Sequence, residues 1–257
     1  ASVAEQKTLF DISFVEPWFL DRELSWGVDL FYLTRNYKDT SSYNSEMAGF
    51  SNSFGWKYTE ELSHSVKYTL RNDKIFDISD GASRYVREQE GTTLTSMVSQ
   101  TLFWDYLDNR YNPTDGWYLS LSNDLAGLGG DNRYLRSDYS FGTYTPLSDK
   151  WVLGLSTTGG YIFGFGQDVR LNNRYFLGGG NLRGFETGGV TARAKQGNDS
   201  LGGNWQLTAS AQLMFPLGLP SEFGMKGKIF TDWGVTGKPS GFNESEMWYS
   251  SKLRGSI

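Results

Sequence analysis

Cysteine is absent from the 257 residues, which excludes a disulfide framework, a thiolate metal site and a cysteine nucleophile. The single histidine is His64, so a catalytic triad or a multi-histidine metal centre would rest on one side chain. The net charge of −5 argues against nucleic acid as a partner. We therefore predict that the protein is not an enzyme, needs no cofactor or bound metal, and does not bind nucleic acid.

Long hydrophobic segments are also lacking. No run approaches the roughly 18 apolar residues of a membrane-spanning helix, and hydrophobic residues make up only 38% of the chain. Aromatic residues nevertheless reach 16%, and there are 31 glycines. A disordered chain would lack those aromatics, and a soluble globular domain would contain more apolar residues. This composition favours an all-β protein in which every second residue faces water or a polar lumen, so any membrane would be crossed by strands.

Alternation of apolar and polar residues is the dominant pattern. Between residues 24 and 32 the apolar face carries Leu24, Trp26, Val28, Leu30 and Tyr32. Segments 204–215 and 225–235 alternate in the same way, and the polar face of the second contains Lys226, Lys228, Phe230, Asp232 and Gly234. A soluble β-sandwich gives the same alternation, so the period alone does not decide between a sandwich and a membrane barrel.

Loop lengths favour the barrel. We expect strands at residues 7–15, 24–33, 46–57, 62–71, 93–106, 117–126, 133–145, 150–163, 203–215, 223–236 and 251–257. Short connections (16–23, 59–61, 146–149 and 216–222) alternate with long ones (34–45, 72–92, 164–202 and 237–250). Two connections depart from this rule: 107–116 is long for a short turn, and 127–132 is brief for a long loop. An up-and-down meander gives such parity when tight periplasmic turns lie at one end and extracellular loops at the other.

Strand length and aromatic placement agree with this interpretation. Stretches of about 9 to 14 residues suit a tilted crossing of a bilayer, and aromatics such as Trp104, Tyr106, Trp117 and Tyr118 lie near strand ends. We predict one domain, residues 1–257, that forms a transmembrane antiparallel up-and-down β-barrel. Bacterial barrels normally have an even number of strands. Because about 11 segments are present and the last stops at Ile257, we expect the barrel to be incomplete, with closing C-terminal strands missing and no signal peptide at ASVAEQ.

The longest connection contains RYFLGGGNLRGFETGGV. Its three consecutive glycines, Gly178, Gly179 and Gly180, allow backbone conformations that other residues avoid. A nucleotide-binding loop is excluded because the segment lacks the Lys-Ser/Thr pair of a P-loop and no βαβ unit follows. A Gly-rich surface loop without a special role remains the alternative.

Four motifs occur in order along the chain: Glu16-Pro17-Trp18-Phe19, the turn 109–116 (NRYNPTDG), Leu182-Arg183-Gly184-Phe185, and Phe230-Thr231-Asp232-Trp233-Gly234. These motifs resemble those of BamA-type outer-membrane protein insertases in the bacterial surface antigen superfamily. They are similar to the family's NPYF-type turn, its R-x-x-x-P-T-x-G turn, its (V/I/L)RG(F/Y) loop motif and its F-x-D-x-G strand. The resemblance implies strands four to thirteen of a sixteen-stranded barrel, plus the start of the fourteenth, without the N-terminal POTRA domains.

The resemblance also implies a role for the long extracellular loop. In the family this loop folds back into the lumen, where the motif arginine contacts an acidic group on the inner wall. Arg183 would then bind Asp232, which lies on the polar face of its strand together with Phe230. Families of this type usually carry glutamate where this sequence has Gln212, so the arginine would have one charged partner and one amide.

By resemblance, the function is ATP-independent assembly and insertion of β-barrel proteins in the outer membrane of Gram-negative bacteria. The implied partners are outer-membrane lipids, unfolded β-barrel clients, accessory assembly lipoproteins and periplasmic chaperones. One alternative within the superfamily is a protein-translocation or two-partner secretion barrel. A passive porin, in which the loop only narrows the pore, is a further alternative from a different class.

Overall fold

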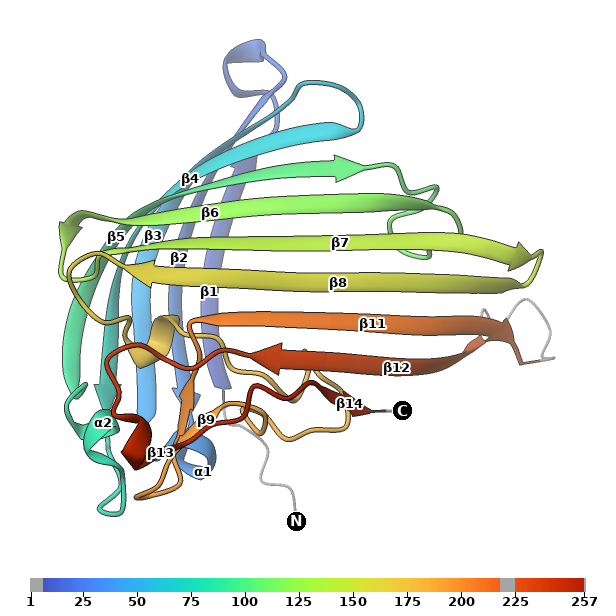
Figure 1. Cartoon of the computed structure of the whole chain (residues 1–257). Coiled ribbons are helices and arrows are strands. Elements are labelled where there is room, and N and C mark those ends of the chain that lie inside the picture. Colours follow the sequence, from blue (N-terminus) through green and yellow to red (C-terminus); the bar gives the residue numbers. More distant parts are fainter. Residues whose placement is uncertain (1–6, 218–224, 257) are drawn as a thin grey trace.

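The computed structural model describes residues 7–217 and 225–256, and one curved antiparallel sheet of 11 strands dominates it (Figure 1). Its strands are β1 (Lys7–Glu16), β2 (Leu24–Asn36), β3 (Asn44–Lys57), β4 (Leu62–Phe76), β5 (Gly91–Asp105), β6 (Gly116–Gly130), β7 (Tyr134–Ser148), β8 (Trp151–Gly164), β11 (Trp205–Pro216), β12 (Lys226–Thr236) and β14 (Arg254–Ser256). Each pairs with its neighbour in chain order, with β8 followed by β11 and β12 by β14. The predicted all-β up-and-down meander is therefore confirmed.

Some strand ends differ from the prediction. The pairing of β2 with β3 continues to Asn36 and Asn44, which leaves only residues 37–43 of the connection predicted at 34–45. The tyrosine rings of Tyr37 and Tyr43 lie 5.4 Å apart across this end and extend the hairpin. The strand expected from residue 251 begins at Arg254. The predicted turn 216–222 and the first residues of the strand predicted from 223 lie partly outside the described residues.

The two faces of the sheet differ in polarity, as the alternation predicts. On β12, Ile229 and Trp233 lie on the convex face with 59% and 38% of their surface exposed. Asp232, between them in sequence, is on the concave face and only 5% exposed. A convex surface of apolar side chains is what a lipid-facing wall requires, because lipid offers no partner to a polar group. Along the part of the chain that the structure describes, no helix has the length and apolar character to cross a bilayer.

Aromatic pairs mark the rim of short turns. The rings of Tyr106 and Trp117 stack with centroids 4.7 Å apart, and those of Trp151 and Phe215 stack at 5.4 Å. Tyr118, predicted as a girdle residue beside Trp117, instead lies on the concave face over Gly142. The correction follows from strand geometry, because successive side chains point to opposite faces.

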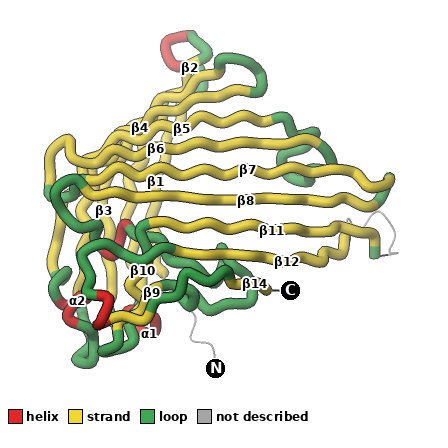
Figure 2. The backbone as a smooth tube through the Cα atoms, in the orientation of Figure 1, coloured by secondary structure: helices red, strands yellow, loops and turns green. Residues whose placement is uncertain are grey.

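The long connections gather at the opposite end of the sheet and form a cap (Figure 2). They contain helices α1 (Lys38–Ser41) and α2 (Arg84–Arg87) and a separate three-stranded sheet in the order β10-β9-β13. Its strands are β9 (Ala192–Ala194), β10 (Ser200–Gly202) and β13 (Met247–Trp248). Among the described residues, the 3-10 helices η2 (Leu171–Asn173) and η4 (Glu244–Glu246) also lie in these connections, whereas η1 (Phe19–Asp21) lies in the short β1–β2 connection at the other end of the sheet. The three short strands were not predicted, because two or three residues are too few to display a period of two.

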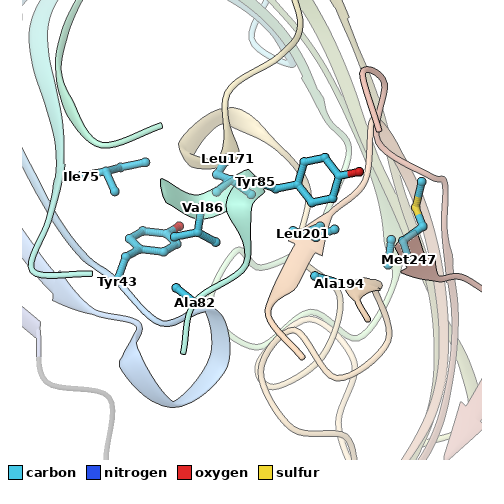
Figure 3. Close-up of a cluster of buried hydrophobic side chains, with 10 residues drawn as sticks. Tyr43, Ile75, Ala82, Tyr85, Val86, Leu171, Ala194, Leu201 and Met247 are labelled. Carbon is cyan, nitrogen blue, oxygen red and sulfur yellow. The ribbon is translucent and has the colours of Figure 1, made fainter. Parts of the chain in front are cut away.

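The cap has a hydrophobic core of its own (Figure 3). Its buried members come from four separate connections or the strand ends beside them, and they include Tyr43, Val86, Leu171, Leu201 and Met247. Tyr85 of α2 donates a hydrogen bond from its hydroxyl to Glu246 at 2.7 Å, which ties the β4–β5 connection to the β12–β14 connection. The cap is therefore a packed unit and not a set of independent loops.

Candidate functional site

The long connection between β8 and β11, residues 165–204, lies on the concave side of the sheet (Figure 1). Its side chains contact inward-facing residues of β4, β7 and β12. The predicted placement of this loop within the lumen is thus what the structure shows. Two glycine-containing stretches, 178–180 and 188–189, flank the segment that carries the arginine motif.

Arg183 and Asp232 are brought together in a bidentate ion pair. Nε of Arg183 donates to Oδ2 of Asp232 at 2.6 Å, and Nη2 donates to Oδ1 at 2.7 Å. The backbone N–H of Arg183 also donates to Oδ2, at 3.2 Å. Side-chain exposure is 39% for Arg183 and 7% for Asp232, so the carboxylate depends on these donors. The hydrogen bond to Asp232 raises the pKa of the Arg183 guanidinium.

Two further contacts fix the orientation of the guanidinium, and a third holds the backbone of Arg183. Its central carbon lies 3.4 Å from the centroid of the Phe230 ring, a cation–π arrangement. Nη2 donates to Oγ of Ser210 at 3.0 Å, and Ser210 donates in turn to Asp232 at 2.7 Å. The hydroxyl of Ser256 on β14 donates to the backbone carbonyl of Arg183 at 2.5 Å. The loop tip therefore joins β11, β12 and β14. Both carboxylate oxygens of Asp232 accept from nitrogen donors of Arg183, which disfavours a role of Asp232 as a metal ligand.

Gln212 does not serve as the second partner that the sequence suggested. Its side chain lies along β8, with Cγ and Nε2 3.1 Å from the position that a methyl group on Gly154 would occupy. Ser210 takes its place, because Ser210 is directly opposite Asp232 in the register of β11 and β12, whereas Gln212 is opposite Phe230. Gln212 is thus on the predicted face but two residues too far along the strand.

Leu182 anchors the apolar side of the tip. It is fully buried, and its two terminal carbons lie 3.2 Å from where a Cβ on Gly234 would stand. Leu177, also fully buried, approaches the same position to 2.9 Å. Glycine at 234, the last residue of the F-x-D-x-G motif, is therefore what allows the loop to lie flat on β12.

The glycines of the motif region have different roles. Gly178 and Gly179 adopt φ of 128° and 67°, and Gly184 adopts φ of 85°, conformations that favour glycine. Gly180 has an ordinary φ and open space where a side chain would project, so the structure does not require glycine there. Phe185 contributes its backbone carbonyl, which accepts from the N–H of Gly179 at 2.8 Å and closes the tip.

Several polar residues at this loop were not predicted. Ser210 and Ser256 carry no motif that would distinguish them from other serines. Two Arg-x-Asp sequences, Arg71-Asn72-Asp73 on β4 and Arg136-Ser137-Asp138 on β7, did carry a signal. Residues i and i+2 share a strand face, so an Arg-x-Asp sequence in a predicted strand places an ion pair on one wall. The structure shows both pairs, with N–O distances of 3.0 Å and 2.7 Å.

Comparison of the sequence with known proteins gives consistent relatives. The chain is 33% identical over 251 residues to outer membrane protein assembly factor BamA of Neorickettsia risticii, covering 96% of this chain and 34% of that protein. It is 29% identical over 256 residues to BamA of Nitratidesulfovibrio vulgaris, covering 98% of this chain and 31% of that protein. The sorting and assembly machinery component 50 homolog of Xenopus tropicalis is 27% identical over 235 residues, which cover 89% of this chain and 49% of that protein. The chain thus spans about a third of the length of the BamA relatives.

Solved structures show the same fold. The crystal structure of BamA from Haemophilus ducreyi lacking POTRA domains 1-3 superposes with a TM-score of 0.79 at 24% identity, covering 90% of this chain and 50% of that one. CdiB from Acinetobacter baumannii gives a TM-score of 0.56 at 15% identity, covering 95% of this chain and 42% of that one. The profile of the Omp85 superfamily domain matches residues 1–256. The chain with this curved sheet and its lumenal arginine loop therefore belongs to the Omp85 superfamily.

Proposed function

We propose that the protein carrying this chain assembles and inserts β-barrel proteins into the outer membrane, and that this chain supplies part of its barrel wall. The observation that carries the proposal is the Arg183–Asp232 anchor, set within a barrel whose sequence relatives are named outer membrane protein assembly factors. The location of the chain is the bacterial outer membrane, in keeping with its BamA relatives and its apolar convex face.

The proposed role is non-catalytic. An incoming strand gains backbone hydrogen bonds by pairing with an exposed strand edge, and a closed barrel leaves no unpaired backbone in lipid. Insertion can therefore be driven by strand pairing and burial without ATP or a covalent intermediate. The clients would be unfolded β-barrel proteins, delivered by periplasmic chaperones and received with the help of accessory lipoproteins. Residues 1–257, together with the strands that complete the barrel, would form a single domain.

In this proposal the loop anchor maintains the conformation of the barrel that clients meet. The bidentate pair, the stacked Phe230 ring and the Ser210 hydroxyl hold the tip against three strands at once. If the tip were released, β11, β12 and β14 would lose the contacts that join them through the loop. We expect the barrel to remain folded but to support assembly poorly.

The test is depletion of the protein in its own host, followed by measurement of folded, heat-modifiable outer-membrane barrels. A loss across unrelated barrels is the expected result. Loss of one secreted protein with other barrels intact would replace the proposal with a translocation function, and loss of uptake of one solute would replace it with a porin function.

Complementation then tests the anchor. Arg183→Ala should fail to restore barrel levels, because the buried carboxylate of Asp232 loses its charged partner. Asp232→Asn should restore them partly, since an amide oxygen still accepts one N–H. The matched control is Lys228→Gln, which removes a positive charge from the same face of β12 and should complement fully. Normal assembly with Arg183→Ala would argue against the anchor.

A further inference from the structure

The loop has a second attachment at its root, on strands other than those that hold the motif. Val169 and Tyr175 are each 3% exposed and pack in a buried cluster with inward-facing residues of β5 to β8. The members contributed by the wall are Met97, Ala126, Tyr134 and Ile162. Apolar side chains on the lumen wall of a barrel would face water unless something covered them. Residues 169–175, called the root here, provide that cover.

Tyr175 is held by one of the Arg-x-Asp pairs. Its hydroxyl donates to Oδ1 of Asp138 at 2.8 Å, and the guanidinium carbon of Arg136 lies 4.3 Å from the centre of its ring. Arg136 also donates from Nε to Oδ2 of Asp138 at 2.7 Å. The ring is therefore packed against the cation while its hydroxyl binds the anion of the same pair, so both ends of the ion pair recognise one side chain.

Asn173 is held by the other pair. Nη2 of Arg71 donates to Oδ1 of Asn173 at 2.8 Å, while Nε of Arg71 donates to Asp73 at 3.0 Å. Asp73 also accepts from the Thr95 hydroxyl at 2.8 Å, and Asn132 donates to Thr95 at 2.7 Å. Asn173, Asp73, Thr95 and Asn132 are all at most 5% exposed. Groups this well shielded from water are costly to leave without partners, so the network favours one position of Asn173.

Backbone hydrogen bonds complete the root. The N–H of Tyr175 donates to the carbonyl of Gly203 at 3.0 Å, and the N–H of Gly203 donates back at 2.8 Å. Arg174 is 5% exposed and donates from Nε to the carbonyl of Val169 at 2.8 Å and from Nη1 to that of Leu201 at 3.1 Å. The outgoing segment of the loop, residues 169–175, is thus hydrogen-bonded at the root to the returning segment, residues 201–203.

The tip is attached differently. It combines the Arg183–Asp232 ion pair, in which the Arg183 side chain is 39% exposed, with the buried side chain of Leu182 against Gly234 of β12. Gly178 and Gly179, both with positive φ, separate the tip from the root. The geometry thus provides two attachments of the loop, the root on β4 to β8 and the tip on β11, β12 and β14.

We propose that residues 169–175 are a second, independent positioning site of the loop, built from the Arg71–Asp73 and Arg136–Asp138 pairs and the apolar cluster between them. When the Arg183–Asp232 pair opens, the root stays docked and the loop remains inside the lumen. Asn173 and Tyr175 are its positioning residues. The proposal concerns the docking of the loop and holds whether or not the protein is an insertase.

Hydrogen–deuterium exchange on the complete protein in lipid nanodiscs tests this. In Arg183→Ala, exchange of residues 177–190 should become at least about tenfold faster, while that of residues 168–176 changes less than about twofold. In the double variant Asn173→Ala/Tyr175→Ala, exchange of residues 168–176 should become at least about tenfold faster, while that of residues 177–190 changes less than about twofold. Asn173→Asp keeps the acceptor oxygen for Arg71 and should retain slow exchange at 168–176. Lys228→Gln should leave both segments unchanged.

Either of two results would overturn the proposal. One is acceleration of both segments by a single-site change, which would mean that root and tip open as one unit. The other is unchanged exchange at 168–176 in the double variant, which would mean that these side chains do not hold the root. Residues 116–130 of β6 serve as the internal check of barrel folding. If the double variant disturbs β6, the milder Tyr175→Phe and Asn173→Ala single variants decide by the same criteria.

Discussion

The three consecutive glycines of the loop should respond very differently to alanine. A methyl group on Gly178 would overlap the backbone carbonyl oxygen of Glu186, and its φ of 128° is strained for any L-residue. Backbone strain of about 1–3 kcal/mol and overpacking of about 1–3 kcal/mol give roughly 2–6 kcal/mol for Gly178→Ala. Gly179 has φ of 67°, in the left-handed region, where a Cβ costs about 1–2 kcal/mol.

Gly180 provides the contrast. No atom lies within 4 Å of the position of an added Cβ, so we expect Gly180→Ala to change loop docking by less than about 0.5 kcal/mol. The assay is hydrogen exchange of residues 177–190 in the complete protein, where about 1.4 kcal/mol corresponds to a tenfold change in rate. Heat-modifiability on gels verifies that the barrel itself is folded in each variant.

The expected order of exchange rates is therefore wild type and Gly180→Ala slowest, Gly179→Ala faster and Gly178→Ala fastest. Equal effects at the three positions would refute the reasoning, because they would mean that the run is needed for general flexibility and not for two particular backbone conformations. A large effect at Gly180 alone would refute it equally.

Two further changes probe other parts of the molecule. Gly234→Ala should displace Leu177 and Leu182, whose side chains lie 2.9 Å and 3.2 Å from the position of the added carbon. We expect this to weaken docking of the tip by about 1–3 kcal/mol, which would appear as faster hydrogen exchange of residues 177–190. Unchanged exchange would contradict the close packing. In the turn between β5 and β6, hydrogen bonds from the Thr114 hydroxyl and from the backbone of Asp115 and Thr114 lower the pKa of Asp108 to about 2 from 3.8. Because the folded-state pKa is the lower one, this stabilisation is complete above pH 3.8 and is lost as the pH falls through about 2. The melting temperature of Asp108→Asn should thus lie below that of the wild type at pH 6, with the difference shrinking between about pH 4 and pH 2, and a difference independent of pH would contradict the assignment.

Much of the wall was predictable because each strand shows its alternation of apolar and polar residues within its own sequence. A strand with one face in lipid must alternate, and the alternation at residues 24–32 and 204–215 is visible without any knowledge of partners. The contact of Arg183 with Asp232 followed from a family resemblance combined with the polar face of β12. Ser210 could not be chosen over Gln212, since both lie on the same face and only the register between β11 and β12 separates them.

The cap and the loop root were not predictable in the same way. The cluster that contains Tyr43, Val86 and Leu201 draws on segments without periodicity, so no pattern connects its members. The Arg-x-Asp sequences could have marked two ion pairs on the wall, but nothing in them indicates that Asn173 and Tyr175 would be the groups they bind. Such contacts depend on how a loop of about forty residues folds back, which is a tertiary property.

The shared core of the cap has a consequence for the order of folding. Ser41 donates to the carbonyl of Ser200 across 159 residues of sequence, and Tyr85 donates to Glu246 across 161. Contacts of such long range close only after the intervening hairpins exist, because loop-closure entropy opposes them until then. The cap would therefore be among the last parts to become ordered, and its formation would report that the hairpins from β3 to β12 are already in place. An antibody fragment that recognises only the assembled cap would therefore detect when the hairpins from β3 to β12 have formed during biogenesis.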